Sequence, residues 1–120
     1  MKGTHLRFYT CENRRHDGKL LYEWLLEYAR KQGIHGGSAF RAIAGFGRHG
    51  HLHEQRFFEL AGEVPVLVEF LVDAEHADRL LADLRAQRID VFCSRIASDF
   101  GALVDLDDND GKPPQPAAGS

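Results

Sequence analysis

Two stretches of the chain place apolar residues at the same helical spacing of i, i+3, i+4 and i+7, which gives each predicted helix one apolar stripe. The first stripe consists of Leu21, Trp24, Leu25 and Tyr28, and the second of Ala77, Leu80, Leu81 and Leu84. We therefore predict helices over residues 18–32 and 74–86. Asp17 and Asp73 are placed to cap their starts, and Gly33 to end the first one. Both stripes require a common apolar layer to cover.

Strand-like segments flank each helix and supply that layer. They span residues 5–11, 38–44, 64–72 and 89–96. The third, VPVLVEFLV, is almost continuously apolar, as expected for a central strand buried on both faces.

The order strand-helix-strand occurs twice, which favours an α+β, ferredoxin-like βαββαβ fold: one four-stranded antiparallel sheet with both helices on one face. The other face keeps apolar residues and needs a cover, for which homo-oligomerisation is the simplest solution. We expect a single domain over residues 1–104 and a disordered acidic, Pro-rich tail over 105–120.

Composition limits the classes of partner. Fifteen Lys and Arg against 18 Asp and Glu give a net charge of −3, unlike the basic field of a nucleic-acid binder. No apolar run is long enough to span a bilayer, and the N-terminus lacks the apolar segment of a signal peptide. Cys11 and Cys93 are too few for a disulfide scaffold and are expected to be reduced, structural thiols of a cytoplasmic protein.

Between the second and third predicted strands lies GFGRHGHLHE, which carries three histidines in strict alternation. Because alternate residues of an extended segment point to the same side, His49, His51 and His53 could converge on one Zn²⁺, Cu²⁺ or Ni²⁺ ion. The alternative is an exposed polar loop that happens to contain histidines.

The same loop begins with a glycine-bracketed segment that could contact an anion. Gly45 and Gly47 on either side of Phe46 allow close backbone approach, and Arg48 offers planar donors suited to phosphate oxygens. The alternative is that the glycines only let the strand bend out of the sheet.

Other chemistry-bearing residues have ordinary explanations. The cluster NRRHDG over residues 13–18 is either a capped loop or an anion contact at a helix start. Trp24 and Tyr28 belong to the core stripe. Glu69, inside an apolar strand, must either face a cleft or be paired. No nucleophile–base pair or cofactor fingerprint indicates an enzyme.

The run GIHGGSAFRAIAGFGRHGH, followed by VPVLVEFLVD, resembles the PII signalling proteins. From about residue 3 to 97, including HLRFYTCENRR and GKLLYEWLLEYARKQGI, the chain is more closely similar to an uncharacterised PII-like branch of that superfamily.

This resemblance implies a ferredoxin-like homotrimer with ligand clefts between subunits and no enzymatic activity. In PII proteins the GFGR segment forms the base of a mobile loop and contacts an adenine nucleotide. By that comparison Gly45, Phe46 and Gly47 line the cleft, Arg48 reaches the phosphates, and loop 48–63 meets a target protein. PII proteins also carry a glycine-rich GDGK-type stretch before their last core strand, which RAQRIDVF lacks here. The resemblance thus leaves the identity of the anion open.

Overall fold

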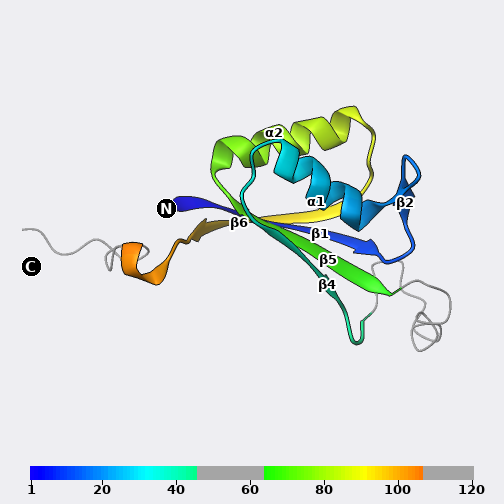
Figure 1. The fold of residues 1–120 in the computed structure, drawn as a ribbon, viewed down its shortest axis with the longest axis horizontal. Coiled ribbons are helices and arrows are strands. Elements are labelled where there is room, and N and C mark those ends of the chain that lie inside the picture. Colours follow the sequence, from blue (N-terminus) through cyan, green and yellow to red (C-terminus); the bar gives the residue numbers. More distant parts are fainter. Residues whose placement is uncertain (46–63, 107–120) are drawn as a thin grey trace, which may run out of the picture.

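The computed structural model describes residues 1–45 and 64–106. Four antiparallel strands in the order β4-β5-β1-β6 form one sheet, and both helices lie on the same face of it (Figure 1). The elements are β1 Lys2–Cys11, β2 Arg15–His16, β3 Lys19–Leu20, α1 Leu21–Lys31, β4 Gly37–Arg41, β5 Pro65–Val72, α2 Ala74–Ala86, β6 Phe92–Asp99 and the short 3-10 helix η2 Leu103–Asp105. The predicted ferredoxin-like α+β fold is confirmed.

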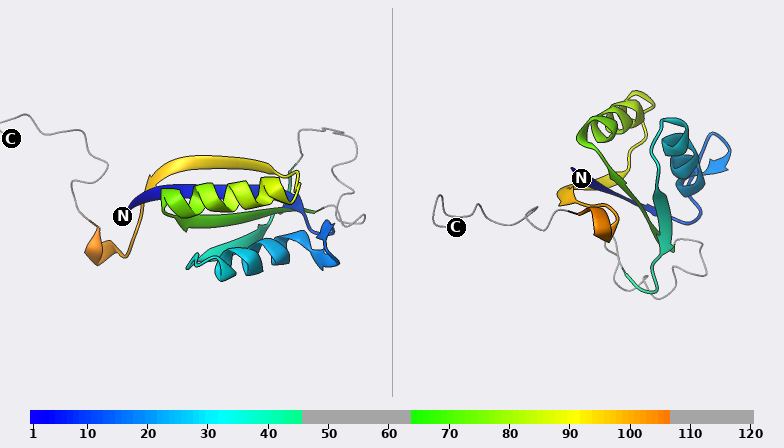
Figure 2. Two further views of the ribbon diagram at one scale, coloured as in Figure 1. Left: turned by 90° about the horizontal axis from the view of Figure 1, so that it is seen from above. Right: turned by 60° about the vertical axis from the view of Figure 1, so that its left-hand side comes forward.

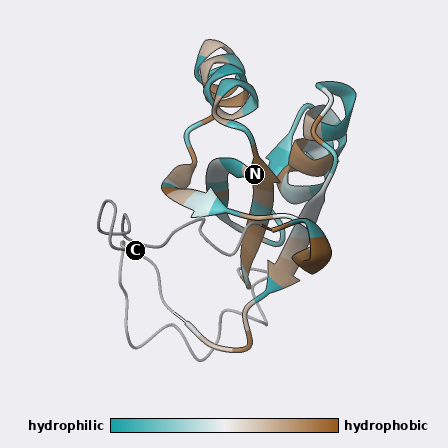
Figure 3. Cartoon of the chain, turned by 90° about the vertical axis from the view of Figure 1, so that its left-hand side faces the viewer, coloured by the Kyte–Doolittle hydropathy of each residue, from teal (hydrophilic) through white to brown (hydrophobic). Residues whose placement is uncertain are grey.

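The hydrophobic core lies between the sheet and the two helices, which run side by side above it (Figure 2). Hydropathy colouring shows mostly apolar residues along the central strands and many polar residues in both helices (Figure 3). Phe8 and Phe70, from neighbouring strands, are almost fully buried and meet edge to face at 6.1 Å between ring centroids. Leu25 of α1 and Leu80 of α2 complete this layer from above.

The central strand β1 is longer than predicted, since it begins at Lys2 rather than at His5. It pairs with β5 from Thr4 to Cys11 and with β6 from Lys2 to Tyr9. Gly3 permits this extension. A Cβ there would overlap the carbonyl oxygen of Val72 and the ring of Phe100.

The start of the first helix differs from the prediction. Asp17 and Gly18 have φ of 51° and 78°, and they form the two-residue turn between β2 and β3. An Asp-Gly pair with positive φ at both positions is typical of a type I′ hairpin, whereas an N-cap residue needs extended backbone. Asp17 is therefore not a cap, and α1 begins at Leu21, after an N-cap residue that provides no side-chain hydrogen bond.

The end of α1 matches the sequence pattern. Gly33 has a φ of 90°, and the amide of Ile34 donates to the carbonyl of Ala29 at 3.1 Å. A left-handed glycine followed by such a bond is the Schellman arrangement that ends many helices.

Aromatic residues of α1 connect it to α2. The rings of Trp24 and Tyr28 stack with centroids 4.8 Å apart, and Tyr28 Oη donates to Asp83 Oδ2 at 2.9 Å. This hydrogen bond and burial raise the pKa of the Tyr28 phenol. Both rings are half-buried and pack against the core. The prediction that Trp24 and Tyr28 belong to the core is therefore correct, and they lie at its edge.

The second helix begins where the sequence predicted. The Asp73 carboxylate accepts from the backbone amide of His76 at 2.7 Å and lies 2.8 Å from His76 Nδ1. These two hydrogen bonds hold the pKa of Asp73 below its ordinary value of 3.8.

Asp73→Ala is expected to lower the midpoint of thermal unfolding by a few degrees, because an N-terminal amide of α2 loses its acceptor. The pKa of Asp73 is depressed in the fold, so its contribution is complete above 3.8 and is lost as the pH falls through the folded-state value. The difference from the parent protein should therefore be full at neutral pH and shrink in acid. Glu75→Ala, which removes an acidic residue of the same turn that caps no amide, is the control. An equal loss in both variants would contradict the capping role.

The last strand begins three residues later than predicted, at Phe92 rather than Ile89, and continues to Asp99. Arg88 leaves α2 with a φ of 57°, and the amide of Ile89 still bonds to the carbonyl of Leu84 at 3.0 Å. Ile89 and Val91 then pack against the core instead of pairing with β1. Strand pairing starts only where Phe92 lies opposite Tyr9.

Candidate functional site at the root of segment 46–63

Three strand ends meet where the chain leaves the sheet for residues 46–63. The amide of Ala42 donates to the carbonyl of Pro65 at 2.8 Å, and the amide of Glu12 donates to that of Val64 at 2.8 Å. The side chain of Glu12 also accepts from Arg41 Nη2 at 2.6 Å. The ends of β1, β4 and β5 are thereby tied into one anchored base.

The described residues include Gly45, the first of the predicted ligand-binding residues. Strand β4 ends at Arg41, before the predicted limit of Ala44. Gly45 is exposed, and a Cβ at its position would meet no atom of the described residues within 4 Å. Within the described residues, the space beside its Cα is therefore open.

The remaining predicted site residues lie outside the described ranges. These are Phe46, Gly47 and Arg48 of the anion segment and His49, His51 and His53 of the metal segment. Within residues 1–45 and 64–106, no group of three or more His, Cys, Asp or Glu side chains is arranged to hold a metal ion. Neither helix in these ranges is long and apolar enough to cross a bilayer.

The sheet face opposite the helices carries three rows of side chains, which follow from the strand register. One apolar row consists of Phe92, Tyr9, Leu67 and Phe40; a polar row of Ser94, Arg7, Glu69 and Ser38; and a third row of Ile96, His5 and Leu71. Five apolar side chains of this open face are 40–50% exposed, and Leu67 is half-buried; the five are Tyr9, Phe40, Leu71, Phe92 and Ile96. The prediction that β5 is buried on both faces is therefore wrong within the described part of one chain, because Leu71 is 45% exposed on the face away from the helices.

Glu69 lies in the polar row. Of the two predicted alternatives, facing a cleft or being paired, the structure shows that Glu69 is paired. Its Oε2 lies 2.9 Å from His5 Nε2 and 3.8 Å from Arg7 Nε. Arg7 Nε is buried and makes no hydrogen bond to the described residues. Strict alternation of His5, Arg7 and Tyr9 places them on one face, but sequence alone could not show which acidic residue lies across from them.

The polar cluster at residues 13–18 forms the β2–β3 hairpin rather than a helix start. Arg15 Nη1 donates to the carbonyl of Gly18 at 3.2 Å, and the ring of His16 meets Trp24 edge-on at 4.6 Å. These contacts are local and structural. The anion-contact alternative loses its basis, since no helix begins at Asp17.

Both cysteines are free and half-buried. Cys93 points from β6 toward α2, and burial raises the pKa of its thiol. Its neighbourhood contains a cavity with two arginines that sequence reasoning missed, because Arg85 and Arg95 lie ten residues apart and are brought together only by the packing of α2 on β6.

Solved structures with this arrangement define the class of the fold. A PII-like signalling protein of Thermus thermophilus superposes with a TM-score of 0.52 at 16% identity, over 81% of this chain and 89% of the other. CPII of Thiomonas intermedia K12, a nitrogen regulatory PII-like protein, bound to ADP, AMP and acetate, gives 0.54 at 13% identity, over 88% and 94%. The chain thus has a PII-like fold.

Sequence comparison identifies the family itself. Residues 3–91 match the family DUF190, described as "Uncharacterized ACR", and the chain belongs to it. A UPF0166 protein of Aquifex aeolicus is 35% identical over 82 residues, which cover 68% of this chain and 78% of the relative. A UPF0166 protein of Methanocaldococcus jannaschii is 29% identical over 84 residues, covering 70% and 77%. The predicted resemblance to a PII-like branch is confirmed.

Proposed function

We propose that the protein is a non-enzymatic, cytoplasmic regulator of the PII-like type. It binds a small anionic ligand, with an adenine nucleotide as the first candidate, in clefts between the subunits of a homotrimer. The observation that carries this proposal is the position of Gly45 beyond the edge strand β4, at a base anchored by three strand ends. CPII, which shares the fold, has been solved with ADP and AMP bound.

The open sheet face supports the self-association. Phe40 and Phe92 are each 50% exposed and Leu71 is 45% exposed, and they belong to one continuous face of the sheet. Exposed apolar patches of this kind usually mark an interface. Sheets that face each other around a common axis would cover these rows and bring neighbouring subunits close to each loop base.

The mechanism we propose is a transition from disorder to order in loop 48–63. The backbone at Gly45 to Gly47 contacts the ligand, and Arg48 donates to its anionic group. Because Arg41 and Glu12 fix the base of the loop through their 2.6 Å ion pair, ligand contacts restrict its remaining freedom. The ordered loop then presents a surface to a target protein.

Isothermal titration of the full chain with ATP, ADP, AMP and cyclic nucleotides tests this function. We expect at least one of them to bind with a dissociation constant below millimolar, and Arg48→Ala to weaken it by about tenfold or more. Arg56→Ala, which removes an arginine further along the same segment, is the control. Absence of binding below millimolar would remove the nucleotide version of the proposal.

A second candidate function is supported by the alternation of histidines in the sequence. We propose as an alternative that His49, His51 and His53 bind a divalent metal ion and that the protein serves in metal tolerance. The test is the metal content of tag-free protein, together with titration of Zn²⁺, Cu²⁺ and Ni²⁺ into the parent and His51→Ala. Unchanged metal affinity in the variant would exclude this candidate.

A further inference from the structure

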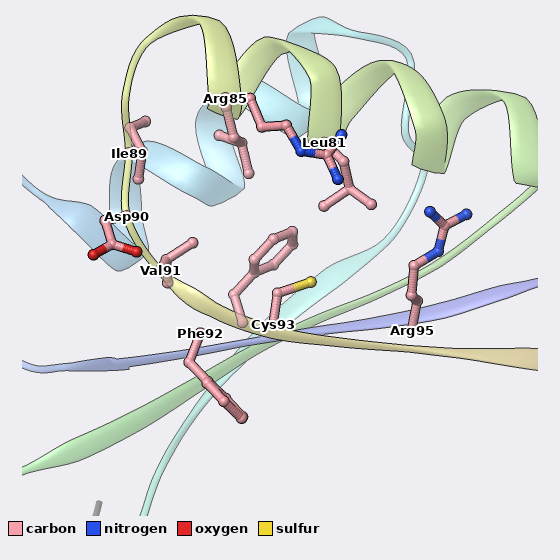
Figure 4. Close-up of a pocket in the computed structure, with 10 residues that line it drawn as sticks. Leu81, Arg85, Ile89, Asp90, Val91, Phe92, Cys93 and Arg95 are labelled. Atoms are coloured by element: carbon pink, nitrogen blue, oxygen red, sulfur yellow. The ribbon is translucent and has the colours of Figure 1, made fainter. Parts of the chain in front are cut away.

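The polar row on the open sheet face contains a cation and an anion, Arg7 of β1 and Glu69 of β5, which lie opposite each other. This row runs between the two rows that carry the exposed apolar side chains of the face. One of these side chains, Phe92, points away from α2, to the side of the sheet that the helices leave uncovered (Figure 4). A surface that covers both apolar rows must therefore also cover the charged pair.

Within one chain the arginine of this pair is not satisfied. Arg7 Nε is 3.8 Å from Glu69 Oε2, which is too long for a hydrogen bond. The same nitrogen is buried and has no hydrogen-bond partner in the described part of the chain. A guanidinium group carries five N–H donors, and those of Arg7 donate no hydrogen bond to any other residue of the ranges 1–45 and 64–106.

The Glu69 carboxylate keeps an unused acceptor. Its Oε2 lies 2.9 Å from His5 Nε2, whereas Oε1 accepts no hydrogen bond from the residues that the structure describes. A carboxylate has about four acceptor sites on its two oxygens. Glu69 can therefore take a second partner while the contact with His5 holds its orientation.

Covering the open face makes these unused groups costly. The Arg7 side chain is 38% exposed and that of Glu69 is 29% exposed in one chain, so water reaches both. When another surface removes that water, a donor or a charge left without a partner opposes the contact. The covering surface must therefore bring an acceptor to Arg7 and a donor to Glu69. A second copy of the same face carries both.

We propose that the open face recognises a second copy of this chain through an ion pair between subunits, from Arg7 of one copy to Glu69 of the next. The inference rests on the proposed homotrimer and names the residues that select its partner. In a closed ring of three copies every interface is the same contact, so the pair forms three times. Arg7 donates to the unused Oε1, and the flanking apolar side chains exclude water from the contact.

Exchanging the two charges tests whether the pair forms between copies. The swapped chain carries Arg7→Glu and Glu69→Arg, and it keeps opposite charges facing each other when all copies are alike. We therefore expect it to assemble as the parent does. His5 is compatible with the exchange, because a neutral imidazole can accept a hydrogen bond from a guanidinium group. Where a swapped copy meets a parent copy, two carboxylates or two guanidinium groups face each other, so the two kinds of chain should exclude each other.

Capture of co-expressed chains measures this exclusion. A tagged swapped chain is expected to capture untagged parent chain at a level about tenfold or more below that captured by a tagged parent chain. The control exchanges an exposed pair away from the open face, Lys19→Glu with Glu27→Lys, whose charged atoms are 2.8 Å apart. Chains with this control exchange should mix freely with the parent, since their pair acts within one chain.

Arg7→Gln provides a second measurement with a smaller change to the chain. We expect it to weaken self-association about tenfold or more in sedimentation equilibrium, whereas Lys19→Gln leaves self-association unchanged. Free mixing of swapped and parent chains would overturn the inference and leave the homotrimer standing, and so would unchanged self-association of Arg7→Gln. A parent protein that stays monomeric would overturn the homotrimer as well, which distinguishes the two failures.

Discussion

Phe40→Asp is expected to convert the proposed homotrimer into monomers at micromolar concentration. Phe40 lies on the open face, opposite Leu67 of β5, and is 50% exposed in a single chain. In the proposed assembly an aspartate there would be buried against apolar side chains without a partner, which costs several kcal/mol. Sedimentation velocity or multi-angle light scattering measures the change in mass directly.

The matched control is Val104→Asp, which introduces the same charge at a side chain 90% exposed outside the sheet. It should leave the mass unchanged, and circular dichroism should show that both variants remain folded. A parent protein that sediments as a monomer under these conditions would remove the assembly and the intersubunit cleft with it.

Leu80→Ala is expected to destabilise the fold by about 2–5 kcal/mol, the range for a leucine truncated in a packed core. Leu80 is 1% exposed, and α2 places it between the sheet and α1. The expected loss is a large part of the total stability of a small domain. Urea unfolding at one fixed protein concentration provides the measurement, since any assembly adds to the apparent stability.

Leu103→Ala removes the same atoms from a side chain that is 85% exposed, and its effect should stay within about 0.5 kcal/mol. A similar loss in both variants would mean that burial against this core does not determine stability, contrary to the structure.

The sequence predicted the elements with strong periodicity and missed those decided by local turn chemistry. The stripe from Ala77 to Leu84 and the cap at Asp73 were sufficient to place α2 within the sequence. Asp17 is also a residue type that commonly caps helices. Because Gly18 follows it, the pair adopts the positive φ angles of a hairpin turn instead. Arg88 ended α2 without glycine or proline, so the late start of β6 had no sequence signal.

The candidate sites show a similar division. Glycine and arginine spacing predicted a ligand contact at residues 45–48, of which the structure describes Gly45 alone, and hydrogen bonds tie together the strand ends that precede it and follow segment 46–63. The pairing of Glu69 with His5, and the approach of Arg85 to Cys93, depend on strand register and on helix packing. No pattern along one segment encodes such contacts between distant segments.

The polar row between the two rows that carry the apolar side chains of the open sheet face has a consequence for how copies of the chain would meet in the proposed homotrimer. If one subunit slid past another by a single step, Arg7 and Glu69 would face carbon instead of polar groups. In the proposed homotrimer, misaligned contacts would thereby be penalised, and a different polypeptide would need the same alternation of polar and apolar rows to join it. The alternating rows would thus fix the relative position of two neighbouring subunits. This effect is separate from the stability that burial of the apolar side chains provides.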